Sequence, residues 1–405
     1  MVTSTTKTND AALRLIKRAI IALSVAAFGS GMSMRVMDPM LIQIAHEFDI
    51  PLGIASWTIT VFGVAYGFSQ LIFGPLGDRY GKVRIIACGS AACSFAAFLC
   101  GITTDFSWLL IARVFAGATA ASIIPLAMAW IGDVVPYDQR QSVLAKFLIG
   151  QILGLSTGVF IGGFCVDFLH WRSPFFFICL WFAVISVYLG LMIPRLPEYT
   201  HIVQLGEGDG LTRALGEFRR VLDVAWAKQV LFTVGMEGAA VFGALAFIPA
   251  HLHTVHNVSL FSSGAFVMLF GLGGLAFAFR SGFWVARFGE VGLIRAGALV
   301  MCMALIALGW LPVWWLLIIA CFLFGLGFYM MHNTLQINAT QMAPERRGAA
   351  VAAFASCFFI GQSLGVAITG ALFTVAGTSL LLTCSGLLVL IIGERFARLR
   401  KLRTS

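Results

Sequence analysis

The stretch Trp314-Trp-Leu-Leu-Ile-Ile-Ala-Cys-Phe-Leu-Phe-Gly-Leu-Gly-Phe-Tyr329 contains no charged side chain, and its apolar residues follow one another without a break. Residues 83–101 have the same character apart from Arg84. Hydrocarbon offers no water to backbone polar groups, so a chain that crosses it must pair them internally, as a helix or a closed barrel. Barrel strands alternate apolar and polar residues. Because these stretches do not alternate, they predict membrane-spanning helices.

The composition of the whole chain agrees with this prediction. Apolar residues make up 60% of the 405 residues and charged residues 11%, whereas an ordinary soluble domain carries about 25% charged residues. The net charge of +9 would suggest nucleic-acid binding in a soluble protein. Here the distribution of basic residues along the spans explains it, and we expect no nucleic-acid partner.

The apolar segments predict a twelve-span membrane protein, since a spanning helix needs about 20 mostly apolar residues. The predicted spans are 19–41, 54–76, 83–103, 106–131, 143–165, 174–194, 229–250, 261–281, 291–311, 313–337, 349–372 and 376–394. The fold class that follows is an all-α membrane protein.

Basic residues indicate how these spans are oriented. If both termini are cytoplasmic, all of the 27 Lys and Arg residues except Arg35, Arg113 and Arg172 fall on the cytoplasmic side. Such a bias is typical of inner-membrane proteins. We therefore predict a multi-pass protein of the cell inner (cytoplasmic) membrane with both termini in the cytoplasm. No A-x-A-like cleavage site follows the first apolar run, so we expect it to be a retained span.

The spans divide into two sets of six. The longest polar stretch separates them and predicts these parts: a cytoplasmic N-terminal tail at 1–18, a six-helix half at 19–194, a central cytoplasmic loop at 195–228, a second six-helix half at 229–394 and a basic cytoplasmic tail at 395–405. We expect the basic residues of the last part to contact anionic lipids.

Two short motifs recur between the halves. Gly74-x4-Arg79-x-Gly81 returns as Gly282-x4-Arg287-x-Gly289, a shift of 208, and Gly150-Gln-Ile-Leu-Gly154 returns as Gly361-Gln-Ser-Leu-Gly365, a shift of 211. The similar shifts predict two pseudo-symmetric halves, related as parallel repeats with the solute path between them.

The segment between predicted spans two and three reads Gly74-Pro-Leu-Gly-Asp78-Arg79-Tyr-Gly81-Lys82-Val-Arg84. It closely resembles the loop signature of the major facilitator superfamily. Together with twelve spans around a central loop, the resemblance covers essentially the whole chain. It implies the major facilitator fold and secondary transport by alternating access.

The signature also provides candidate residues for a cytoplasmic gate, namely Gly74, Asp78, Arg79 and Gly81. We expect the two glycines to let the chain turn tightly at the membrane surface. The resemblance implies that Asp78 meets a helix end of the other half, where a carboxylate is stabilised, and closes the cytoplasmic side. The alternative is that the loop only anchors the topology. Ala286 replaces the acid in the second copy, so we expect the acid latch on one side only.

Charged residues inside the spans are the candidates for proton coupling. The segment around Arg113 resembles the family's arginine-bearing fourth span, often linked to proton coupling, and an arginine at that depth needs a partner. Arg35 and Asp38 are three residues apart and share a helix face, and Asp38 and Arg113 both lie about 10 Å below the outer surface. These positions predict an Arg35–Asp38–Arg113 cluster. Burial favours a neutral acid and guanidinium groups favour a carboxylate, so the charge of Asp38 stays open.

Glu237 is the only acid well inside the second half's spans, and the sequence shows no basic neighbour for it. A lone buried carboxylate tends to take up a proton, which makes Glu237 a candidate proton carrier beside Asp38. The alternative is a structural hydrogen bond to a neighbouring span.

Two further spans carry unusual residues. Span five has glycines about every four positions, which allow close helix contact. It resembles the glycine-rich fifth span of the family's antiporter branch, except that Val159 follows Gly158 where that branch usually has proline.

Span ten carries a polar patch. His332, Asn333 and Gln336, together with Gln70 of span two, are candidates for a substrate cavity, while snorkelling toward the cytoplasm is the alternative for span ten.

Other kinds of chemistry find little support. His251-x-His253-x-x-His256 lies in a predicted outer loop, and several methionines lie close together in span one. Histidines in loops and methionines in spans are also common in proteins that bind no metal, so we expect no metal site. The nine cysteines form no C-x-x-C and predict neither zinc nor a disulfide framework. No G-x-x-x-x-G-K-[ST] motif indicates ATP use. We expect no cofactor and no enzymatic activity.

The sequence as a whole predicts a monomeric transporter that exports a small organic or amphipathic compound in exchange for protons, similar to the family's twelve-span drug/proton antiporter branch. The main alternative is an uptake symporter or a facilitator of a small metabolite. A metal ion transporter and a membrane receptor or scaffold are less favoured. A static scaffold needs neither the Asp78 latch nor charged residues inside its spans.

Overall fold

The computed structural model describes residues 2–197, 200 and 210–404, and within them twelve helical segments are long and apolar enough to cross a membrane. These segments match the twelve predicted spans in order and confirm the all-α fold. They are Leu13–Glu47, Leu52–Tyr80, Lys82–Ile102, Phe106–Val134, Ser142–Phe168, Ser173–Arg195, Ala225–His256, Leu260–Phe279, Ser281–Trp310, Trp314–Gln341, Pro344–Ala376 and Thr378–Arg403.

Several spans consist of two helices in succession. The helices are α1 (Val2–Arg35), η1 (Asp38–Met40), α2 (Leu41–Glu47), α3 (Leu52–Ala55), α4 (Trp57–Tyr80), α5 (Lys82–Ile102), α6 (Phe106–Ala120), α7 (Ile123–Val134), α8 (Tyr137–Phe168), α9 (Ser173–Met192), η2 (Ile193–Arg195), α10 (Gly210–Asp223), α11 (Ala225–Leu245), α12 (Ile248–His256), α13 (Leu260–Phe279), α14 (Ser281–Trp310), α15 (Trp314–Gln341), η4 (Pro344–Arg346), α16 (Arg347–Ala376) and α17 (Thr378–Thr404).

Spans one and seven break at corresponding places. Pro39 lies in the first turn of η1, and Pro249 lies in the first turn of α12. Proline has no N–H to donate and clashes with the preceding turn, so a helix stops before it. Interrupted spans of this kind often carry the binding sites of transporters, and the first break contains Asp38.

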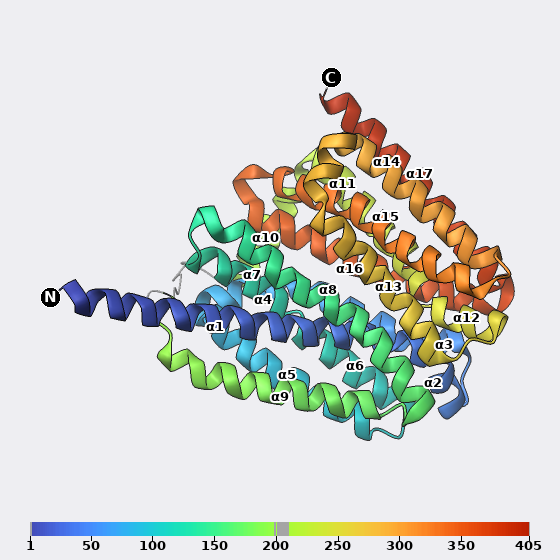
Figure 1. Ribbon diagram of the computed structural model, residues 1–405, viewed down its shortest axis with the longest axis horizontal. Coiled ribbons are helices and arrows are strands. Elements are labelled where there is room, and N and C mark those ends of the chain that lie inside the picture. The colour runs from blue at the N-terminus through green and yellow to red at the C-terminus, as the bar shows by residue number, and fades with distance from the viewer. Residues whose placement is uncertain (1, 198–199, 201–209, 405) are drawn as a thin grey trace.

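The helices before and after the central segment form two groups, blue to green and yellow to red in Figure 1. The groups meet where α8 packs on α13 and where α4 packs on α16. The α8–α13 contact is close, because a Cβ on Gly163 would lie 2.4 Å from the backbone oxygen of Leu260, and one on Gly264 would lie 2.7 Å from that of Val159. No side chain could fit between the two helices at these points.

The second recurring motif forms equivalent helix contacts in the two groups, α8 on α1 and α16 on α11. A Cβ on Gly154 would lie 2.1 Å from the oxygen of Phe28, and one on Gly365 would lie 2.0 Å from that of Ala239. Phe28 and Ala239 are 211 positions apart, the same shift that separates the glycines. The predicted close packing of span five and the repeat are thus confirmed at this contact.

The first recurring motif places its last glycine in a turn. Gly81 has φ 91° and connects α4 directly to α5, and Gly289 has φ 60° at the equivalent bend inside α14. The prediction that Gly74 also makes a turn is wrong. Gly74 lies within α4, which continues to Tyr80 despite Pro75, because one residue with positive φ is enough to reverse the chain.

Alanine substitutions separate these two roles. Gly81→Ala is expected to lower the free energy of unfolding by about 1–2 kcal/mol, since only glycine adopts positive φ without steric cost. Gly74→Ala is expected to raise it by up to about 1 kcal/mol, since alanine favours the helix and a Cβ there meets no atom within 4 Å. Thermal unfolding of the purified protein in detergent measures both. Equal effects would contradict the assigned turn.

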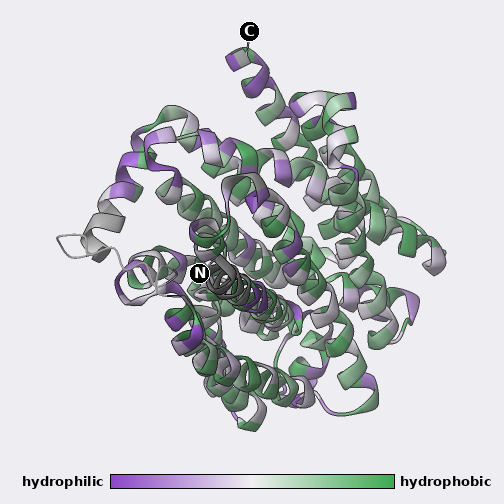
Figure 2. Cartoon of the chain, turned by 60° about the vertical axis from the view of Figure 1, so that its left-hand side comes forward, coloured by the Kyte–Doolittle hydropathy of each residue, from purple (hydrophilic) through white to green (hydrophobic). Residues whose placement is uncertain are grey.

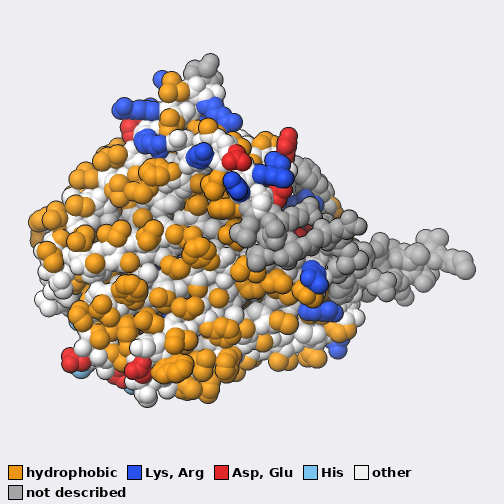
Figure 3. All heavy atoms as spheres, turned by 180° about the vertical axis from the view of Figure 1, so that it is seen from behind, with side chains coloured by type: hydrophobic (Ala, Val, Ile, Leu, Met, Phe, Trp, Pro, Cys, Tyr) orange, Lys and Arg blue, Asp and Glu red, His pale blue; other side chains and the backbone are white. Residues whose placement is uncertain are grey.

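Two faces of the molecule bear different charges. We call the side with both termini, the Gly81 turn and α10 the terminal face, and the opposite side, with α2 and α12, the far face. Figure 2 shows long apolar helices, with polar residues gathered toward their ends. In Figure 3 the Lys and Arg side chains gather along one side of the molecule, with some acidic side chains among them, and the side chains at the opposite edge are acidic rather than basic. On the far face, Arg172 pairs with Glu47 at 3.0 Å.

The predicted central loop contains a helix, α10, although 198–199 and 201–209 of that loop lie outside the described residues. This amphipathic helix contacts both α4 and α16. Its Glu217 pairs with Arg346 of η4 at 2.7 Å. The segment that joins the two groups of helices therefore packs on both of them at the terminal face.

Candidate functional site

The first buried ionic pair lies at the break in span one. Arg35 Nη2 is 2.5 Å from Asp38 Oδ2, and both side chains are almost completely buried. The predicted pair is therefore present, but not on one continuous helix face. Arg35 is the last residue of α1 and Asp38 is the first residue of η1. The ion pair therefore spans the helix break that precedes Pro39.

Arg113 completes the predicted cluster in a different way from the one expected. Its Nε donates to the backbone oxygen of Thr58 at 3.1 Å and its Nη1 to that of Ser33 at 3.2 Å, while its guanidinium lies 4.3 Å from the ring centre of Phe62. Asp38 interacts with Arg113 electrostatically, but its ion-pair partner is Arg35. The carbonyl acceptors have no signature in the sequence and could not be predicted.

The second buried pair consists of Glu237 and His332. His332 Nδ1 is 2.7 Å from Glu237 Oε2, the carboxyl is completely buried, and the imidazole is 15% exposed. The expectation that Glu237 has no basic neighbour is wrong, because α15 brings His332 onto it from 95 positions away. Glu237 Oε1 makes no hydrogen bond with any residue that the structure describes.

Aromatic side chains surround the imidazole. The rings of Phe328 and Phe358 both lie 4.8 Å from that of His332, centre to centre. Phe242 packs edge-on against the same two phenylalanines, and the guanidinium of Arg35 lies 5.2 Å from the ring centre of Phe242. These rings form an apolar bridge between the two ionic pairs, one from each group of helices.

The other predicted cavity residues do not join this cluster by any hydrogen bond between described residues. Gln70 is buried in α4, Asn333 is half-buried, and Gln336 is exposed on α15. His332 and Gln336, both candidates for the cavity, thus differ in environment. Substrate binding by these three residues stays a prediction.

The predicted gate loop forms ion pairs around Lys82. Its Nζ lies 2.9 Å from both Asp78 and Asp133, and this links the Gly81 turn to the end of α7. Arg79 lies beside the ring of Tyr80. In this arrangement Asp78 pairs within its own half, and Asp133, which the sequence did not single out, shares its partner.

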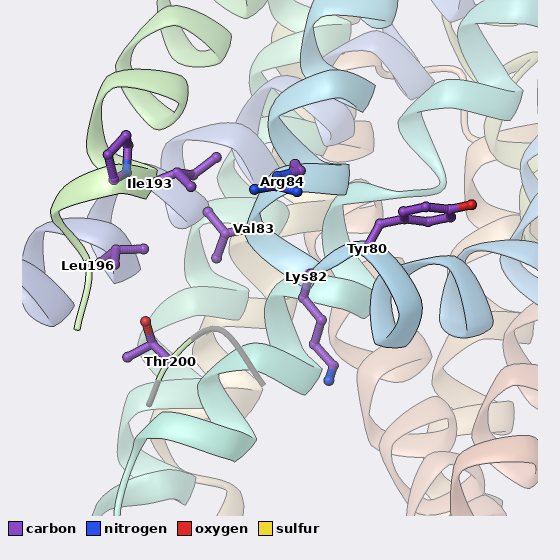
Figure 4. A pocket seen from close by; sticks show the side chains of 9 residues that line it. Tyr80, Lys82, Val83, Arg84, Ile193, Leu196 and Thr200 are labelled. Atoms are coloured by element: carbon purple, nitrogen blue, oxygen red, sulfur yellow. The ribbon is translucent and has the colours of Figure 1, made fainter. Parts of the chain in front are cut away.

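A cavity of about 400 Å³ lies next to this turn, between the start of α5 and η2 with the residues that follow it. Figure 4 shows Val83 pointing toward Ile193 and Leu196, whereas Tyr80 points away from them. Sequence reasoning did not find this cavity, because it depends on how the ends of two spans meet.

His251, His253 and His256 do not lie in a loop, although the sequence predicted one there. They lie on α12, because span seven continues to His256. His251 is buried, and its ring nitrogens contact Thr378 Oγ1 at 2.5 Å and the oxygen of Leu308 at 2.9 Å. Within the described residues no three His, Cys, Asp or Glu side chains are grouped to hold a metal ion.

The fold, the glycine turn and the buried charges can now be compared with known proteins. The family model described as Major Facilitator Superfamily matches residues 23–366. The chain belongs to the Major Facilitator Superfamily.

Two full-length relatives support this membership. The superfamily transporter described here is 24% identical over 373 residues to the uncharacterized MFS-type transporter YwfA of Bacillus subtilis, covering 91% of this chain and 89% of the relative. It is 26% identical over 383 residues to Multidrug resistance protein 2 of the same organism, covering 87% and 88%. The expected resemblance to multidrug transporters of the family is thus confirmed.

A solved structure shows the same fold. The bacterial homologue of the human lysosomal transporter Spinster, in an inward-facing and unoccupied conformation, superimposes with a TM-score of 0.77 at 17% identity, covering 95% of this chain and 96% of that one. The superfamily member is accordingly a multi-pass membrane transporter that binds a small-molecule substrate.

Proposed function

We propose that this transporter exports a small organic or amphipathic compound in exchange for protons, by rocking its two six-helix halves around a central site. The observation that carries the proposal is the Glu237–His332 pair. A buried carboxyl with one oxygen free of hydrogen bonds is costly inside a membrane protein and is usually retained for function. Similarity to Multidrug resistance protein 2 supports export.

The pair is suited to bind and release a proton. The carboxyl of Glu237 is completely buried, while the imidazole that contacts it, that of His332, is partly exposed and can pass a proton on. A proton on this pair changes the charge enclosed by Phe328 and Phe358. It therefore favours whichever arrangement of the halves best accommodates the new charge.

Asp38 is suited to a different role. The guanidinium of Arg35 forms a direct ion pair with it at the break in span one, and such a contact favours the carboxylate. Asp38 therefore acts as a structural charge that holds Arg35 in the first half, while Glu237 carries the proton.

The Gly81 turn acts as the cytoplasmic gate. Lys82 holds Asp78 in the present arrangement, and Asp133 can keep Lys82 when Asp78 leaves. On closure, Asp78 then meets a helix N-terminus of the other half, where its charge is favourable. The terminal face is cytoplasmic, since most Lys and Arg lie there, and it contacts anionic lipids. The protein works as a monomer in the inner membrane.

The experiment follows the pH gradient across inside-out vesicles that contain the transporter. A panel of organic cations, organic anions and neutral amphipathic compounds is added in turn. At least one is expected to dissipate the gradient in proportion to the amount of transporter. Vesicles that contain the folded protein but respond to no compound would reject proton antiport. Co-accumulation of protons with a compound would instead favour an uptake symporter.

A further inference from the structure

A small cavity lies between the two groups of helices, at the level of the first ionic pair. Its volume is about 20 Å³, and it is lined by α1, α8, α11, α13 and α15. Phe242, Phe270 and neighbouring aliphatic side chains form most of the wall. The lining also includes the polar residues Arg35, Ser156 and Tyr329. A mainly apolar wall with a few converging polar groups is typical of small-molecule sites.

Among the residues that line the cavity, Arg35 has buried donors without a hydrogen-bond partner in the part of the chain that the structure describes. Its side chain is 2% exposed, and its Nη1 makes no hydrogen bond with any described residue. Nη2 already faces Asp38. A guanidinium group carries donors on both sides of its fork, so an acceptor in the cavity can complete Arg35 without displacing Asp38.

The charge around the cavity points to the same kind of ligand. Arg35 and Arg113 carry two positive charges and Asp38 carries one negative charge. The net charge of this buried cluster is therefore +1. A buried charge is costly unless it is neutralised. Neither Glu237 nor any other acid forms an ion pair with Arg113 among the described residues. A monoanion in the cavity would balance the cluster.

We propose that the transported compound is an amphipathic organic monoanion, such as an aromatic carboxylate, whose anionic group binds Arg35 Nη1. Tyr329 donates a second hydrogen bond from its hydroxyl, and the apolar part of the compound packs on Phe242 and Phe270. This inference rests on the proposed function for its transport step and names the substrate class of that function. The anion site is separate from Glu237, so a proton and the compound can occupy the protein by turns.

The present cavity holds about one water-sized group. A substrate therefore enters when the halves separate and widen the space between α8 and α11. Because the guanidinium of Arg35 lies on Phe242 of the other half, an anion on Arg35 also changes a contact between the halves. Binding of the anion is thereby linked to their rocking.

The test measures binding of three probes that share one ring system and differ in charge: 1-naphthoate, 1-naphthalenemethanol and 1-naphthylmethylamine. Isothermal titration of the purified full-length protein in detergent gives the affinities. Naphthoate is expected to bind at least about tenfold more tightly than the alcohol, and the amine most weakly, as charge-assisted hydrogen bonds imply. Failure of naphthoate to bind, or equal or tighter binding of the amine, overturns the proposal.

Variants locate the site. Arg35→Gln is expected to weaken naphthoate binding by about a hundredfold, and Tyr329→Phe by about tenfold, with little change for the alcohol. Tyr329→Phe leaves every charged group in place, so it tests the site even if Arg35→Gln does not fold. The control is Arg287→Gln on the terminal face, with unchanged binding. If folded Arg35→Gln binds naphthoate as tightly as wild type, the anion does not bind Arg35 and the assignment is overturned. If Arg35→Gln does not fold, equal binding of naphthoate by wild type and Tyr329→Phe overturns it.

Ligand binding is measured without a pH gradient, so the binding experiment tests the anion site independently of proton antiport. If the amine dissipates the vesicle gradient while naphthoate neither binds nor moves protons, the antiport stands and the anion site is rejected. If naphthoate binds through Arg35 and no compound moves protons, the anion site stands and proton coupling is rejected.

Discussion

Glu237→Gln is expected to abolish substrate-driven proton movement while substrate exchange across the membrane continues. The glutamine oxygen can still accept a hydrogen bond from His332 Nδ1, so the contact at 2.7 Å and the packing around it persist. The amide has no proton that it can release or take up, whereas a carboxyl can do both. Exchange of labelled for unlabelled substrate needs only the rocking motion, so it is expected to survive.

The measurement compares proton flux and exchange in the same vesicles. Glu345→Gln is the matched control, because that side chain is 89% exposed on the terminal face and the change in chemistry is identical. Asp38→Asn tests the other acid and is expected to reduce the amount of folded protein, since it leaves Arg35 buried without its partner. Proton movement that persists in Glu237→Gln at wild-type levels would contradict the assigned carrier.

Valine at either of the equivalent glycines is expected to prevent correct folding. A Cβ on Gly154 or Gly365 would overlap a backbone oxygen, at 2.1 Å and 2.0 Å, and a backbone cannot swing aside as a long side chain can. The helices would have to separate along α1–α8 or α11–α16, at a cost of about 3 kcal/mol or more. Yield of monodisperse protein and its thermal unfolding report the effect.

Gly190→Val on α9 is the control, since a Cβ there meets no atom within 4 Å. It is expected to change the free energy of unfolding by less than about 1 kcal/mol. If Gly154→Val and Gly365→Val behaved like Gly190→Val, the helix contacts described here would be incorrect. Similar losses at both positions would support the equivalence of the two halves.

The sequence predicted the spans well because a membrane imposes one simple requirement, a long apolar helix. It also predicted the glycine contacts, since small residues at regular spacing have few other uses in a span. The charged residues Arg35, Asp38 and Glu237 were found for a similar reason: they are out of place in hydrocarbon.

The partners of these residues were harder to predict. Nothing local to Glu237 indicates His332, because the pair depends on how α11 and α15 pack. Pro39 lies in the first turn of η1, but the geometry of the break that places Asp38 against Arg35 depends on the packing of the whole span. Gly74 was assigned to a turn from its place in the motif, although helical propensity and the apolar residues before it extend α4 to Tyr80.

A transporter must never become a channel, and the α8–α13 contact limits where water can pass between the two groups of helices. At Gly163 and Gly264 the two backbones touch without side chains between them. A file of water molecules needs a continuous polar path wide enough for each molecule, and these two points leave no room for one. Between α8 and α13 the barrier is the peptide backbone itself, so it does not depend on a side chain holding one rotamer.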